Sequence, residues 1–290
     1  MANKETKNVK SPPKKKGKSE LVDGDNLLYR VFTELTELPE DVSEPVIELM
    51  IKRTAIWFRP ECYAQTPLML PWVVRDPSCR GPKGQDQWAA PDELGYLRDD
   101  NSLIKPIPRS FTVTGPKDSW YFGKRIGSGF VASHIWRETK AVRLASREPQ
   151  LNSFVPNLVW LPRQIAKLSD REGGKIQKVL QSISWSIYRD TPLASSNKEP
   201  IEKIWNLIPR PKTIANLKVN ELNYFSDTAQ HHDRLHRKLG NVMEALDLAM
   251  DGRVIPESLN LETRYKLGIK KVPRENLEDL MNFLRQYYVD

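Results

Sequence analysis

The segment from Gly129 to Asp170 holds the residues whose types and spacing are best suited to chemistry. One of them, His134, stands in an apolar run, FVASHIW, that has the character of a strand. Twenty residues then separate Trp136 from Asn157, which precedes a second apolar run, LVWL. The pKa of an imidazole lies near neutral pH, so a histidine at a strand end can take a proton from water. An asparagine can bond to backbone groups and hold the histidine's loop, and it is also a favoured helix N-cap.

Three short blocks in this segment resemble the HNH (ββα-metal) nuclease family: ASHI at 132–135, NLVWL at 157–161 and AKLSD at 166–170. They are similar to the branch whose pattern runs A-A-H-I, a variable loop, N-G-L-L-L, four residues and H-x-L-F-D. In that family the blocks form a hairpin and a helix packed across it. The resemblance covers about forty residues. It implies hydrolysis of phosphodiester bonds, with His134 as the general base and Asn157 as the residue that organises the site.

The chain departs from this family at the helix. The family's second histidine, a metal ligand, falls at Ala166 here. Asp170 lies four residues further on, so it would occupy the same helix face one turn later. Oxygen ligands suit Mg²⁺ and Mn²⁺, and Glu138 and Glu148 are further carboxylates in the intervening loop. The resemblance therefore implies a site for Mg²⁺ or Mn²⁺, with Asp170 and Glu138 as the expected ligands.

Positive charge gathers around this motif. The net charge is +8, and residues 120–190 hold twelve Lys or Arg against five Asp or Glu. A basic segment of this kind is expected for a polyanionic partner such as DNA, and a solvated basic face without a partner is the alternative. The glycine-rich stretch 123–129 would form the turn of the hairpin that leads to His134. We expect contacts to nucleic acid from five basic residues near the motif: Lys124, Arg125, Arg137, Arg163 and Lys167.

Two functions from different classes follow from these residues. The first is a divalent-metal-dependent endonuclease that cleaves DNA, with a restriction-type enzyme as one form. The second is a nucleic-acid-binding or assembly protein that kept the fold without catalysis, which the alanine at position 166 favours. A third pattern, His232 and His236 at i,i+4, has a spacing that can bind zinc. No convincing third ligand follows it, so packing at the edge of the core is the expected role of these histidines.

Composition limits the class of protein further. Cys62 and Cys79 do not form a C-x-x-C pair, so we expect free buried thiols rather than a disulfide or a zinc site. No apolar run approaches the roughly 18 residues that a membrane helix needs. We therefore expect no membrane partner and a cytoplasmic location, or a nuclear one in a eukaryote. The large regions on both sides of the motif would also allow a homodimer.

The hydrophobic pattern predicts an α+β fold, in which a small ββα-metal (HNH-like) module lies between largely α-helical flanking regions. Strands are expected within 119–138, and helices within 158–188 with a break at Gly173-Gly174. Four regions are predicted: a disordered basic tail at 1–24, a helical and then loop-rich region at 25–118, the HNH-like module at 119–189 and a helical region at 190–290.

Tryptophans surround the motif in the sequence: Trp88, Trp120, Trp136, Trp160 and Trp185. Most of them are expected in the core. One or two would stack on bases if the bound nucleic acid is single-stranded or has a base flipped out.

Overall fold

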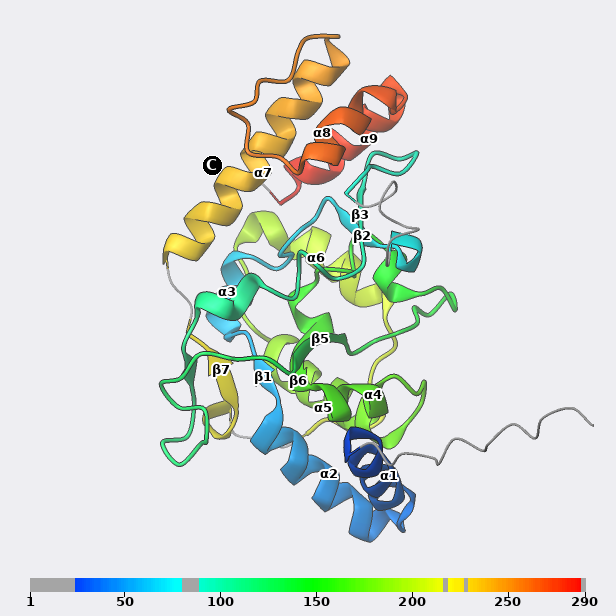
Figure 1. Ribbon diagram of the computed structural model, residues 1–290, viewed down its shortest axis with the longest axis vertical. Helices are drawn as coiled ribbons and strands as arrows, with labels where there is room; N and C mark the ends of the chain where they lie inside the picture. Colours follow the sequence, from blue (N-terminus) through cyan, green and yellow to red (C-terminus); the bar gives the residue numbers. More distant parts are fainter. Residues whose placement is uncertain (1–23, 80–88, 216–218, 227–228, 288–290) are drawn as a thin grey trace, which may run out of the picture.

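A five-stranded sheet lies between two groups of helices (Figure 1). The computed structural model describes residues 24–79, 89–215, 219–226 and 229–287. Within them the chain folds as a mixed α+β protein, as the hydrophobic pattern predicts. The basic tail expected at 1–24 lies outside the described residues, apart from its last position. No helix in these ranges is long and apolar enough to cross a membrane.

The sheet has the strand order β4-β7-β1-β6-β5. Strands β1 and β7 are parallel, and the other neighbours are antiparallel. The strands are β1 (Ile56–Trp57), β4 (Val113–Thr114), β5 (Phe130–His134), β6 (Leu158–Pro162) and β7 (Asn223–Phe225). A second, two-stranded parallel sheet is formed by β2 (Val73–Arg75) and β3 (Leu97–Asp99). The predicted module thus shares its sheet with strands from both flanking regions.

The helices α1 and α2 lie at one end of the molecule and α7, α8 and α9 at the other (Figure 1). Those in the first half of the chain are α1 (Gly24–Glu37), α2 (Glu40–Thr54) and α3 (Pro60–Gln65). The central ones are α4 (Arg163–Ser169), α5 (Lys175–Tyr188) and α6 (Ser195–Leu207), and the last are α7 (Ala229–Met250), α8 (Thr263–Gly268) and α9 (Arg274–Arg285). The break predicted at Gly173-Gly174 separates α4 from α5.

The structure corrects two sequence predictions around the motif. Residues 158–162 form strand β6, whereas a helix was expected to begin at Leu158. The run LVWL is buried on both faces in an interior strand, and a short apolar run does not distinguish such a strand from a buried helix. The expected hairpin within 119–138 is also absent from the described residues, because β5 pairs with β6 across the intervening loop.

Aromatic side chains hold β6 in the core. Trp160 and Phe225 both pack against Phe58, with ring centroids 5.2 and 5.4 Å away. The hydroxyl of Tyr188, at the end of α5, donates a hydrogen bond to the carbonyl of Phe58 at 2.6 Å. Cys62 and Cys79 are both buried. Strand β6 is therefore fixed in the core, and it in turn positions its neighbour β5 at the edge of the sheet.

Candidate functional site

The three blocks of the sequence motif form consecutive elements in a β-β-α order. Strands β5 and β6 pair in antiparallel register from Phe130 opposite Pro162 to His134 opposite Leu158. Helix α4 begins directly after β6 and packs against both strands. The N–H of Arg163 donates to the carbonyl of Gly129 at 2.9 Å, which ties the start of the helix to the start of β5. This order brings His134, at the end of β5, and Asp170, at the end of α4, to one pocket.

Asn157 is fully buried and holds the β5–β6 loop at two points. Its Oδ1 accepts a hydrogen bond from the N–H of Trp136 at 2.7 Å, and its Nδ2 donates to the carbonyl of Leu151 at 3.0 Å. Its own carbonyl accepts from the N–H of Ile135 at 3.0 Å. The expected role in holding the histidine's loop matches these contacts. The expected position as a helix N-cap is wrong, because Asn157 precedes a strand and Pro162 precedes the helix.

His134 is held in one tautomer. Its Nε2 lies 2.8 Å from the carbonyl oxygen of Asn152, which can only accept, so Nε2 carries the proton and Nδ1 the lone pair. Burial lowers the pKa of His134 to about 4; the bond to Asn152 opposes this shift, and the nearby Arg75 adds to it. The imidazole is therefore neutral at pH 7, the form that can accept a proton.

The pocket has a cavity volume of about 460 Å³ and a cationic lining. Arg137 and Arg147 from the β5–β6 loop face it together with Arg75 from the end of β2. Arg75 is paired with Asp100 at 3.2 Å, whereas the described residues provide no ion-pair partner for Arg137 or Arg147. Guanidinium groups bind phosphate oxygens with directed hydrogen bonds. The pocket is thus suited to an anion such as a phosphodiester.

A divalent cation would find one carboxylate in this pocket, that of Asp170. Glu138 does not line the pocket, and its backbone pairs with Leu144 in an isolated bridge. Ala166 lines the pocket at the position where the resembled family has its helix histidine. No group of three or more His, Cys, Asp or Glu suited to a metal occurs in the described part of the chain. Because Mg²⁺ is often bound by one or two carboxylates plus substrate phosphates, the site fits a metal only if substrate supplies ligands.

The expected basic residues do not all gather at the pocket; among those five, Arg137 alone lines it. Lys124 and Arg125 are exposed and lie beside β4, at the other end of the sheet. Arg163 is exposed at the start of α4, and Lys167 extends toward α1, with its Nζ 5.8 Å from the ring centroid of Tyr29.

Sequence reasoning missed two arginines of the pocket, Arg75 and Arg147. Arg147 lies in the β5–β6 loop and contributes to the basic excess of 120–190. Counting the basic residues of that loop alone would have made Arg147 a candidate. Arg75 comes from the small sheet β2–β3, and its distance in sequence from His134 gives no local signal.

Of the two i,i+4 histidines of α7, His232 is buried and His236 is half-buried. His232 is 7% exposed, and its Nδ1 lies 2.8 Å from Oγ1 of Thr66. This hydrogen bond joins two packed segments of the chain. The described residues contain no group of three possible zinc ligands.

The buried, neutral His134 should make the fold sensitive to mild acid. Its pKa is lowered from 6.5 to about 4, so the unfolded chain binds this proton more readily than the folded one. The resulting stabilisation is fully present above pH 6.5 and is lost as pH falls toward 4. Between pH 7 and pH 5, the free energy of unfolding measured with urea should fall by about 2 kcal/mol more in the wild type than in His134→Gln. Equal falls in both proteins would contradict the burial of a neutral imidazole.

The chain was also compared with protein-family models, with curated proteins and with solved structures, and none of the three comparisons gives a match.

Proposed function

We propose that this protein binds DNA at the pocket between β5, the β5–β6 loop and α4, and hydrolyses a phosphodiester bond there. One observation carries the proposal: a neutral His134 and three arginines face the same cavity at the end of a β-β-α unit. The order of the elements agrees with the resemblance to HNH nucleases. The first strand ends in histidine, an asparagine precedes the second strand, and a helix follows.

The chemistry assigned to each residue follows from its contacts. With Nε2 donating to Asn152, the lone pair of Nδ1 is available to deprotonate an attacking water. Arg137 and Arg147 would bind the phosphate oxygens and stabilise the negative charge that develops as the water attacks. Asn157 positions the loop and does not contact substrate, because both ends of its side chain are bonded to backbone.

A divalent cation, Mg²⁺ or Mn²⁺, belongs to this proposal as a group held by Asp170 together with substrate phosphate. When bound, it would act as a Lewis acid on a phosphoryl oxygen. Glu138 is left out of the proposed ligand set because it does not line the pocket.

The arginines give the binding step a direct test. Replacing both Arg137 and Arg147 with alanine should weaken DNA binding about tenfold or more and reduce the salt-dependence slope by about two, since two phosphate contacts are lost. Fluorescence anisotropy with a labelled duplex, over a series of salt concentrations, measures both quantities. Arg285→Ala, an exposed arginine on α9, is the matched control and should bind as the wild type does. An unchanged slope in the double variant would rule out DNA at this pocket.

A second candidate function is binding without cleavage. The observation in its favour is Ala166, which lines the pocket where the resembled family has a metal-binding histidine. Under this alternative, wild-type protein retards DNA on a gel and loses that ability in the double arginine variant, yet leaves plasmid intact with Mg²⁺ or Mn²⁺ present. Metal-dependent nicking by the wild type would exclude it.

A further inference from the structure

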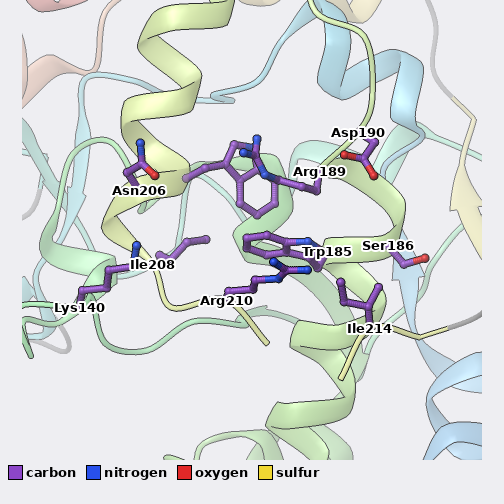
Figure 2. Close-up of a pocket in the computed structure, with 10 residues that line it drawn as sticks. Lys140, Trp185, Ser186, Arg189, Asp190, Asn206, Ile208, Arg210 and Ile214 are labelled. Atoms are coloured by element: carbon purple, nitrogen blue, oxygen red, sulfur yellow. The ribbon is translucent and has the colours of Figure 1, made fainter. Parts of the chain in front are cut away.

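A second cavity, of about 490 Å³, is formed by the end of α5, the end of α6 and the segment that follows α6 (Figure 2). Lys140 joins it from the β5–β6 loop, the same loop that carries Arg137 into the first pocket. The two cavities are thus linked by a single segment of chain. Cavities of this size are in the usual range for sites that take a small molecule or one unit of a polymer.

One wall of this cavity is aromatic and rigid. Trp185 and Trp205 pack edge to face, with ring centroids 5.0 Å apart and planes at 71°. The guanidinium of Arg189 lies 5.7 Å from the ring centroid of Trp185 and 5.6 Å from that of Trp205. Glu202 neutralises this arginine through two bonds of 2.7 and 2.8 Å. Trp185 is only half-buried, so part of its indole remains available to a ligand.

The wall is tied to the β5–β6 loop from behind. Trp136 packs against Trp205 at 6.1 Å, and its Nε1 donates to the carbonyl of Pro209 at 3.0 Å. The N–H of Lys140 donates to the carbonyl of Leu207 at 2.8 Å. The cavity is therefore formed before a ligand arrives, which lowers the entropic cost of binding.

The rim of the cavity carries two basic side chains, those of Lys140 and Arg210. Lys140 and Arg210 are exposed, line the cavity and have no ion-pair partner in the described part of the chain. Asn206 and Asp190 add an amide and a carboxylate to the lining (Figure 2). An aromatic face beside two available cations fits a ligand with a flat ring and an anionic group.

We propose that this cavity binds one unpaired nucleotide of a nucleic-acid strand. Its base would stack on Trp185 and its phosphate would bind Lys140 and Arg210. That the bound nucleotide belongs to a nucleic-acid strand rests on the proposed function. That the cavity binds a nucleotide does not. Bases of an intact duplex are stacked on each other, so the nucleotide must come from a single-stranded region or be flipped out.

The test uses the full chain and three probes: a single-stranded 12-mer with a central 2-aminopurine, the same strand in a duplex, and adenosine monophosphate. The single strand should bind best, and 2-aminopurine fluorescence should be quenched as the base stacks. Trp185→Leu should weaken binding of the single strand about tenfold, and Trp185→Phe should restore most of that loss. Trp120→Leu is the matched control, because Trp120 is 69% exposed and lies outside this cavity.

Exposed variants keep the test valid if Trp185→Leu fails to fold. Arg210→Ala and Lys140→Ala change exposed side chains, and each should weaken binding of the single strand and lower its salt dependence. If adenosine monophosphate binds as tightly as the strand and both depend on Trp185, the ligand of the cavity is a free nucleotide, and the proposal of a nucleic-acid strand is overturned. If none of these variants alters the binding of the single strand or of adenosine monophosphate, the nucleotide site itself is overturned.

The outcome is separable from that of the proposed function. Loss of duplex binding in the Arg137 and Arg147 double variant reports on the first pocket alone. Quenching of 2-aminopurine that depends on Trp185 and survives in that double variant would support the nucleotide site independently of DNA binding at the first pocket.

Discussion

Replacing His134 with glutamine is expected to lower the rate of DNA cleavage by at least about 100-fold, the range in which removal of a general base usually falls. Glutamine is the informative substitution because its amide N–H can still donate to the carbonyl of Asn152, which His134 Nε2 does at 2.8 Å. The variant therefore removes the lone pair of Nδ1 with the least disturbance to the loop. DNA affinity should stay near that of the wild type, because the arginines of the pocket remain.

Single-turnover cleavage of supercoiled plasmid, with Mg²⁺ or Mn²⁺ and with an EDTA control, measures this effect. Arg285→Ala serves as the surface control and should cleave as the wild type does. Since the pKa of His134 is lowered to about 4 by burial, protonation of this base should reduce the wild-type rate only below about pH 5. Wild-type cleavage by the glutamine variant would assign the activity to another site or to a contaminant.

Asn157→Ala should have the largest effect on stability among the motif residues. Asn157 is 0% exposed, and the substitution leaves the N–H of Trp136 buried without its partner and removes the shorter of two hydrogen bonds to the carbonyl of Leu151. An unpaired buried N–H costs about 1–3 kcal/mol and a lost hydrogen bond about 1 kcal/mol, so the free energy of unfolding should fall by about 2–4 kcal/mol. Because these two bonds hold the β5–β6 loop at two points, DNA cleavage should fall as well.

Urea unfolding at pH 7 tests this effect, with two reference variants. Asn157→Asp keeps an oxygen acceptor for Trp136 but removes the donor to Leu151 and buries a carboxylate, so it should also be destabilised. Asn260→Ala changes an exposed asparagine and should stay within about 0.5 kcal/mol of the wild type. If the free energy of unfolding of Asn157→Ala falls by less than about 0.5 kcal/mol, the asparagine does not hold the loop.

The sequence was most informative about the local parts of the site. The spacing of His134, Asn157 and Asp170 predicted a strand end, a loop anchor and a residue at the end of a helix in one small unit. The hydrophobic pattern predicts a helix where strand β6 lies, because a buried run such as LVWL lacks the alternation that marks a half-exposed strand. A local hydrophobic pattern shows which residues form an element better than it shows whether that element is a strand or a helix.

Long-range contacts account for the rest of what sequence reasoning missed. Arg75 reaches the pocket because β2 and β3 pair beside the β5–β6 loop, and no residue near Arg75 in sequence indicates that pairing. The small sheet and the main sheet both depend on packing between segments far apart in the chain. In the same way, Trp185 and Lys140 come together only through the packing of the loop on α6.

The central claim is that DNA is bound at the pocket beside His134, and site-specific photo-crosslinking tests it most directly. A benzoylphenylalanine at Leu144, which lines the pocket and is 43% exposed, should crosslink to a labelled DNA duplex. The same group at Leu267, which is 69% exposed on α8 outside the pocket, is the matched control and should not. Crosslinking at Leu267 but not at Leu144, or equal crosslinking at both, would contradict the account.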